Sequence, residues 1–248
     1  MRFNDRRITS ISGMLNALKV QSSPGKVIWF RGHALKSWKL IPTLARTKKN
    51  LTAENAIVKR FMQNATPHIP NPPREEWEWM FLMQHHRAYT RLLDWTDSPL
   101  TALYFAVTNS SHRRGDGVVW CLDPIALNKE AKVEFEFDAE IPAFGRDKVL
   151  ESYLPTHVHE GTAKLNTIAS VGPRNTPRMA AQLGTFTINH RLHTPIEEIG
   201  AQQHVWRWII PGAAKAGMAD ELALLGYTSL TVFPELDRVS DLTKELLR

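Results

Sequence analysis

Apolar residues recur along this chain at two spacings, and turn residues separate the segments. Three segments have apolar residues at helical spacing, and we predict helices over about 8–20, 52–65 and 75–84. Short runs rich in β-branched and aromatic residues predict strands over 27–31, 117–122 and 205–210. Because helices and strands are interspersed without a regular strand-helix-strand rhythm, we expect an α+β fold with mixed or antiparallel sheets and flanking helices.

The remaining segments have less regular patterns. The alternation in KVEFEF predicts a half-exposed strand over 132–137. Further along the chain we expect a strand over 184–188, a helix over 211–225 that Gly226 ends, a strand over 227–233 and a closing helix. The first helix is expected to bury one stripe made of Ile8, Ile11, Leu15 and Leu18, with Ser10 or Ser12 as its cap.

The stretch from Gln84 to Asn109 joins polar residues to a strongly apolar segment. Asp97 or Ser98 can accept hydrogen bonds from a first helical turn, and Pro99 needs no N–H partner there, so a helix is predicted to begin at this point. Almost every face of that helix is apolar, which predicts that it is buried. The positive end of a buried helix next to His, Arg, Asp and Thr side chains is typical of an anion-binding or catalytic site.

Composition and charge narrow the class of protein. The chain is 43% hydrophobic and 23% charged, which is typical of a globular protein. Its net charge of +6 favours phosphate-rich partners, although scattered solvated Lys and Arg side chains would give the same value. The motifs GxGxxG, GxxxxGK[ST], HExxH and GxSxG are absent from the sequence, which argues against Rossmann dehydrogenases, P-loop NTPases and common hydrolases.

Cysteine and histidine content bears on the compartment and on metals. A single cysteine, Cys121, allows no disulfide within the chain and suits a reducing compartment. With no apolar run near ~18 residues and no signal-peptide pattern, we expect a cytoplasmic protein without a membrane partner. The adjacent His85 and His86 point to different sides, so no metal site is expected.

The stretch QHHRAYTRLLDWTDSPLTALYFA resembles the signature of the FRG-domain proteins. Three more segments match that family in order: 29–32 (WFRG), 178–187 and 229–237. The resemblance covers about residues 27–240 and implies a single domain over 1–248, with an N-terminal helix at about 8–20 and a core at about 27–240. It departs at 86–89 (HRAY), where the family more often has an aromatic-Gly-apolar-Pro turn.

A more distant resemblance concerns the order of Arg31, Thr90 and Gln182 along the chain. This order is similar to the arginine, Ser/Thr and glutamate triad of ADP-ribosyltransferases, which bind NAD across two split sheets. The resemblance implies split sheets and an ADP-ribosyltransferase-like fold. It also implies that Arg31, beside Gly32, holds a phosphate of NAD, that Thr90 and Arg91 support the pocket, and that Gln182 binds a ribose hydroxyl.

Proton transfer needs another group, because Gln182 is neutral and supplies no carboxylate. Asp94 is a candidate for that role, and His85 is a candidate for a ligand contact or proton transfer. Structural roles are also open: Arg31 can pair with a surface carboxylate, Asp94 can cap a helix or pair with Arg91, and Gln182 can be a satisfied amide. The predicted site comprises catalytic Gln182, Asp94 and His85 and NAD-binding Arg31, Gly32, Thr90 and Arg91.

Two functions from different classes fit these observations. One is an NAD-dependent ADP-ribosyltransferase that modifies an intracellular nucleic acid (RNA or DNA) or protein, as a toxin or phage-defence effector with an antitoxin partner. The other is a non-catalytic basic module that binds a nucleic acid or nucleotide through the same arginines. Arg31, Thr90 and Gln182 in one cleft would favour catalysis, whereas guanidinium groups spread over a convex face would favour binding.

Overall fold

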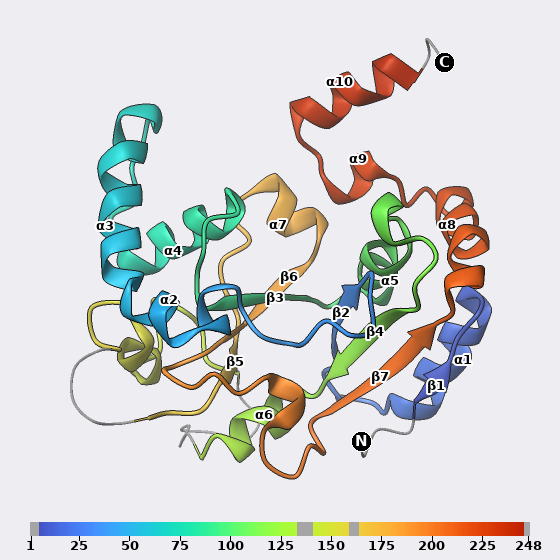
Figure 1. Ribbon diagram of the computed structural model, residues 1–248, viewed down its shortest axis with the longest axis horizontal. Helices are drawn as coiled ribbons and strands as arrows, with labels where there is room; N and C mark the ends of the chain where they lie inside the picture. The colour runs from blue at the N-terminus through green and yellow to red at the C-terminus, as the bar shows by residue number, and fades with distance from the viewer. Residues whose placement is uncertain (1–4, 133–140, 159–163, 246–248) are drawn as a thin grey trace.

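The protein is described by a computed structural model that covers residues 5–132, 141–158 and 164–245. A seven-stranded sheet forms its centre, in the order β1-β7-β4-β2-β3-β6-β5 (Figure 1). Among the strands of the described residues, β1 and β7 pair in parallel and the other neighbours are antiparallel. The strands are β1 (Arg6–Arg7), β2 (Trp29–His33), β3 (Leu92–Thr96), β4 (Gly117–Leu122), β5 (Ile168–Ser170), β6 (Gly184–Ile188) and β7 (Val205–Ile210). The predicted mixture of helices with a mixed sheet is confirmed.

The sheet has a narrow waist between β2 and β3. These strands pair at a single position, Phe30 with Thr96, whereas β2 pairs with β4 and β3 pairs with β6 at five positions each. The expectation of two split sheets is wrong for the described residues, because this one pair joins the two halves into one sheet. The other residues of β2 and β3, including Arg31 and Asp94, form no strand pairs across the waist.

Helices cover both faces of the sheet. The helices of the described residues are α1 (Ile11–Gln21), α2 (Lys48–Thr52), α3 (Glu54–Ala65), α4 (Glu76–His85), α5 (Pro99–Val107), α6 (Pro124–Glu130), α7 (Pro177–Ala181), α8 (Lys215–Leu224), α9 (Ser229–Val232) and α10 (Leu236–Glu245), and not all of them lie on the sheet (Figure 1). Alternate side chains of β4 enter opposite cores: Val119 and Cys121 pack with α1, α5 and α8, whereas Val118 and Trp120 face the other side. Among the described residues, no helix is long and apolar enough to cross a membrane.

The buried face of α1 differs from the expected stripe. Ser10 caps the helix by accepting a hydrogen bond from the Gly13 N–H, as one of the two predicted caps. The helix then buries Ile11, Met14 and Ala17, while Leu15 is 46% exposed. Because the helix begins at Ile11, Ile8 lies outside it, and the prediction that Leu15 belongs to the buried stripe is wrong.

The central apolar helix begins where the capping pattern predicted. Ser98 is the N-cap of α5, its hydroxyl accepts a hydrogen bond from the Thr101 N–H at 3.2 Å, and Pro99 is in the first turn. The helix packs on β2 and buries Ala102, Leu103 and Ala106.

The segment after α8 was predicted incorrectly. Gly226, at φ +76°, follows α8 as expected. The expected strand over 227–233 is instead the short helix α9, because the Thr228 hydroxyl accepts a hydrogen bond from the Thr231 N–H and caps it. In Figure 1, α10 then leads away from the sheet and from the other helices. Most of the expected strand over 132–137 lies outside the described residues.

Gly32 is required by the packing of α5 on β2. A Cβ atom at Gly32 would lie 1.8 Å from the Ala102 carbonyl oxygen and 2.9 Å from the Ala106 backbone nitrogen. The backbone of a helix of the same chain therefore approaches Gly32 closely.

We predict that Gly32→Ala lowers the free energy of unfolding by at least about 2 kcal/mol, because backbone atoms leave no space for the methyl group. Gly217→Ala in α8 is the matched control: a Cβ there meets nothing within 4 Å, and alanine is the better helix former by about 0.5–1 kcal/mol. Denaturant unfolding of both variants tests this, and equal stability of the two would contradict it.

Candidate active site

A cavity of about 150 Å³ opens at the waist of the sheet. Its walls come from β2, β3, α5 and the α7 region, which are far apart in the sequence. The lining residues are Phe30, Arg31, Gly32, Asp94, Trp95, Thr96, Thr101, Ala102, Phe105, Arg178 and Gln182. Three predicted site side chains, those of Arg31, Asp94 and Gln182, therefore meet in one concave space.

Arg31 is held by partners on both sides of the waist. Its Nη1 donates to the Asp94 carbonyl oxygen and lies 4.0 Å from Asp94 Oδ2, and its Nε donates to His33 Nε2 at 3.0 Å. The Arg31 side chain is 25% exposed, and burial lowers its pKa while Asp94 opposes that shift. Within the described part of the chain, Nη2 of Arg31 has no hydrogen-bond acceptor. This nitrogen is available to an acceptor from a ligand, on a guanidinium group that stays charged.

His33 fixes the orientation of Arg31, and no role was predicted for this histidine from the sequence. The side chain is buried, and its Nε2 accepts the proton of Arg31 Nε, so Nδ1 carries the ring proton and donates to the Trp38 carbonyl oxygen at 3.2 Å. Burial, followed by the Arg31 charge, lowers the pKa of His33 to about 3, which keeps the ring neutral. Its place two residues after Arg31 in a strand, on the same face, was the available signal.

Asp94 is oriented by a chain of hydrogen bonds from α4 and the following loop. Gln84 Nε2 donates to Asp94 Oδ2 at 2.9 Å, and the Thr90 hydroxyl donates to Gln84 Oε1. The Asp94 side chain remains 54% exposed, whereas Thr90 is buried. Thr90 thus acts on the cavity through Gln84 and does not line it itself.

Arg91 lies away from the cavity. It is fully buried, its Nε contacts both carboxylate oxygens of Glu54 at 2.7 Å, and its other nitrogens donate to the carbonyl oxygens of Asn189 and Tyr153. An arginine enclosed in this way cannot contact a ligand in the cavity, so we correct its expected role from NAD binding to structure. The alternative that Asp94 pairs with Arg91 is also wrong, because Glu54 is the partner of Arg91.

Gln182 closes the cavity at the end of α7. Its backbone carbonyl accepts a hydrogen bond from the Thr96 hydroxyl, and its side-chain Nε2 donates to the Val232 carbonyl oxygen at 3.0 Å. The nitrogen of the amide group is therefore hydrogen-bonded, in agreement with the alternative that Gln182 is a satisfied amide. Its Oε1 accepts no hydrogen bond from the described residues, so it can still receive one from a ligand hydroxyl.

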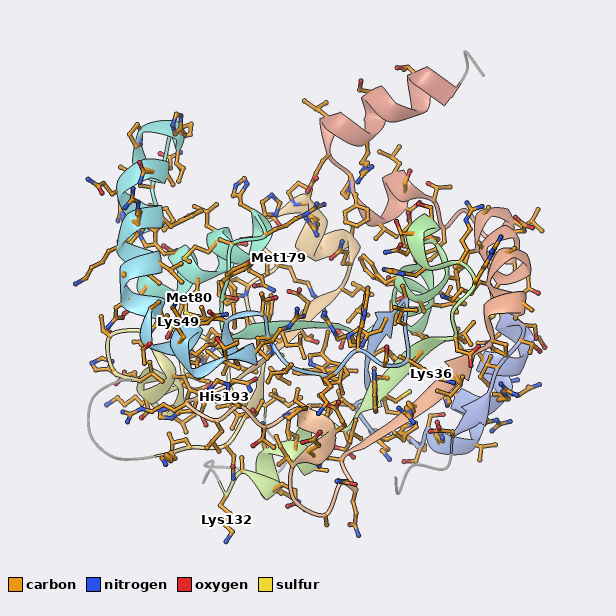
Figure 2. The ribbon with its side chains drawn as sticks, in the orientation of Figure 1. Lys36, Lys49, Met80, Lys132, Met179 and His193 are labelled. Carbon is orange, nitrogen blue, oxygen red and sulfur yellow. The ribbon has the colours of Figure 1, made fainter. Side chains whose placement is uncertain are left out.

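Two adjoining cavities extend the first one into a groove. A space of about 50 Å³ shares Asp94, Arg178 and Gln182 with the waist cavity. A space of about 330 Å³ then shares His85 and Met179 with the middle one, and Met179 is labelled in Figure 2. His85, the third predicted catalytic residue, thus lies along the groove but outside the waist cavity.

Positive charge gathers where the groove passes α7. Arg178 lies with its Cζ 4.9 Å from the centre of the Phe233 ring and its Nη1 3.9 Å from Glu235 Oε1. Burial lowers the pKa of Arg178, while Glu235 and Asp94 raise it. Arg178 begins the segment 178–187 that resembles the FRG family, but no role was predicted for it.

No group of three or more His, Cys, Asp or Glu side chains among the described residues could hold a metal ion.

The turn before Thr90 explains one departure from the FRG signature. Arg87 has φ 60°, the left-handed region that favours glycine, at the position where the signature more often has Gly. The turn therefore keeps a glycine-type backbone with an arginine in it, and Arg87 adds to the positive charge near Arg178.

These observations define an α/β protein with a polar cavity at the waist of one mixed sheet. Residues 26–115 match the family model of the FRG domain, so this part of the chain is similar to that domain. The matched part contains β2, β3 and α5, and hence Arg31 and Asp94, whereas Gln182 and Arg178 lie beyond it. No curated protein and no solved structure matches the chain significantly.

Glu54 and Asp94 are expected to differ in their effect on the free energy of unfolding. Glu54→Gln should lower the free energy of unfolding by about 3–5 kcal/mol, because it leaves the buried Arg91 charge without its partner. Asp94→Asn should change it by less than about 1 kcal/mol, because Asp94 is half exposed. Thermal or denaturant unfolding of the two variants checks this, and a large loss in Asp94→Asn alone would reverse the assignment.

Stability should also depend on pH through His33. The folded pKa of His33, about 3, lies below its ordinary value of 6.5. The neutral ring therefore makes its full contribution to the free energy of unfolding above pH 6.5, and this contribution is lost as the pH falls toward 3. Between pH 7 and 4.5 we expect wild type to lose on the order of 2 kcal/mol more than His33→Gln. The pKa of His204 is also lowered, but His204 is present in both proteins, so its contribution to the pH dependence is the same in each. Equal pH dependence in the two unfolding series would refute the prediction.

Proposed function

We propose that the groove binds NAD and that the protein transfers ADP-ribose from it to an intracellular macromolecule. One observation carries this proposal: Arg31, Asp94 and Gln182, from three separate segments, line one concave cavity. A charged donor, a carboxylate and an amide oxygen in one place suit a ligand that has phosphate and ribose groups.

Arg31 would hold a phosphate of the diphosphate. Its Nη2 has no acceptor among the described residues, and the contacts with His33 and the Asp94 carbonyl hold the guanidinium group in position. A donor that is already oriented loses little conformational freedom when a phosphate binds, which strengthens binding. The oxygen of Gln182 would accept from a ribose hydroxyl.

The size of the groove sets how the dinucleotide would lie. The waist cavity, about 150 Å³, is smaller than the roughly 300–1,000 Å³ of typical ligand pockets. It would therefore hold one part of NAD, and the cavities beside α4 and α7, of about 50 and 330 Å³, would receive the rest.

In the proposed reaction, the bond between C1′ of the ribose and the nicotinamide nitrogen breaks, and its electron pair leaves with neutral nicotinamide. An acceptor oxygen or nitrogen forms the new bond to C1′ with its own electron pair, and its proton passes to the Asp94 carboxylate. Asp94 would also stabilise the positive charge that develops on the sugar. The hydrogen bond from Gln84 keeps this carboxylate in place.

The net charge of +6 favours a phosphate-rich acceptor, so we propose nucleic acid ahead of protein. The neutral side chain of Gln182 favours a second candidate, in which the groove binds a nucleotide or nucleic acid without turnover. NAD cleavage distinguishes these two candidates.

We predict that Arg31→Lys weakens NAD binding about ten- to a hundredfold, the equivalent of losing a charge-assisted hydrogen bond. Lysine keeps the charge but not the planar fork. Calorimetric titration with NAD measures the effect. Arg60→Lys, on the exposed surface of α3 and outside the three cavities, is the matched control and should bind as wild type does.

Turnover is tested in the same series by release of nicotinamide in the presence of cellular RNA, DNA and protein fractions. Asp94→Asn should still bind NAD and lose most of the cleavage. Wild type that binds NAD without cleavage would favour the non-catalytic candidate, and wild type that does not bind NAD would remove the transferase proposal.

A further inference from the structure

The C-terminal segment from α9 to the start of α10 lies over the groove at α7. The Val232 carbonyl oxygen accepts a hydrogen bond from Gln182 Nε2 at 3.0 Å. The Phe233 ring is flanked by two guanidinium groups, with Cζ of Arg178 at 4.9 Å and Cζ of Arg238 at 5.4 Å from its centre. This segment contains the last of the motifs noted in the sequence, and the proposed transfer reaction gives that motif no role.

Glu235 places its carboxylate between two groove residues. Its Oε1 lies 3.9 Å from Arg178 Nη1 and 3.9 Å from His85 Nε2. Both distances exceed those of a hydrogen bond, and this buried oxygen has no hydrogen-bond partner among the described residues. Nδ1 of His85 is also buried without a partner. Glu235 Oε1 thus lies near Arg178 and His85 without a hydrogen bond to either of them.

The surroundings of Arg178 are more positive than one carboxylate can balance. After burial, which lowers the pKa of Arg178 most, the charges of Arg87 and Arg238 lower it further. Burial is also the main cause of the lowered pKa of His85, followed by His86 and Arg178. Among the described residues, Glu235 and then Asp94 raise the pKa of Arg178. If Glu235 moved away, the space would attract another anion.

Two apolar side chains that follow Glu235 in α10 are exposed. In Figure 1, α10 points away from the body of the protein. Leu236 is 87% exposed and Val239 is 44% exposed, so these apolar side chains contribute little packing. Of the α10 side chains that the structure describes, Leu236 and Val239 would lose little packing if Glu235 moved out of the groove.

We infer that the space between Arg178 and His85 is a second phosphate-binding subsite of the groove and that Glu235 occupies it until a phosphorylated ligand displaces it. The C-terminal segment is then a competitor for the ligand. The inference deepens the proposed function and rests on it for the nucleotide, since the two phosphates of NAD would contact Arg31 and Arg178. A phosphate group offers more acceptor oxygens than a carboxylate and can reach both Arg178 and His85.

The test compares wild type with Glu235→Gln in calorimetric titrations with inorganic pyrophosphate and, separately, with NAD. We expect Glu235→Gln to bind pyrophosphate about tenfold more tightly, a typical size for competition between two sites. Glu151→Gln is the control, because it removes an exposed carboxylate that lines none of the three cavities. Adding Arg178→Ala to Glu235→Gln should remove the gain.

A second measurement detects the displacement itself. Limited proteolysis after residue 235 should become faster when pyrophosphate binds wild type and should be fast without it in Glu235→Gln. A merely structural ion pair would give faster proteolysis in the variant without tighter pyrophosphate binding, and that result would overturn the inference.

The outcomes separate the inference from the proposed function. NAD binding by wild type, with no gain in pyrophosphate affinity for Glu235→Gln, removes the subsite and leaves the function standing. A pyrophosphate gain without NAD binding by any variant supports the subsite and removes the NAD proposal. Absence of pyrophosphate binding in every variant overturns the inference.

Discussion

The close contact between α5 and β2 at Gly32 is the constraint on which the rest of the site depends. With no Cβ in the way, the backbone of the helix rests on the strand beside the single pair, Phe30 with Thr96, that joins the two halves of the sheet. The same helix then supplies one wall of the waist cavity, while β2 and β3 supply Arg31 and Asp94. A larger residue at position 32 would move a wall of the site as well as weaken the core.

Around this contact, buried polar groups divide into two kinds. Arg91 and Glu54 satisfy one another inside the protein together with backbone carbonyl groups, and this arrangement holds the loop before β3 in place. Arg31 is only partly satisfied: neutral His33 and a carbonyl oxygen orient it, and one nitrogen remains for an outside acceptor. A fully paired arginine gives rigidity, whereas a partly paired one at a cavity gives a binding group.

The groove combines this oriented donor with a region of unbalanced positive charge at α7. Asp94 and Glu235 are the acidic groups that act on Arg178, and they differ in what they can do. Asp94 is held by Gln84 and lies in the part of the chain that matches the FRG domain model. Glu235 is followed by the exposed side chains of Leu236 and Val239. In the two proposals, the fixed carboxylate and the displaceable one therefore lie in different parts of the chain.

The sequence by itself determined the features that depend on neighbouring residues. Ser98 and Pro99 start α5 because capping acts within one turn, Gly226 follows α8 because it adopts a positive φ, and the β4 and β7 strands follow from local apolar runs. It also brought Arg31, Asp94 and Gln182 forward through motifs, and these meet in one cavity.

Only the tertiary structure decided which partner each side chain has. Arg91 and Arg31 are both motif arginines, yet one is enclosed by a glutamate 37 residues away and the other faces a cavity. The segment over 227–233 has strand-forming residues, but a helix cap acts there, and no neighbouring strand takes it into the described sheet. Burial and pairing arise from elements distant in sequence that pack together, and no local pattern contains that information.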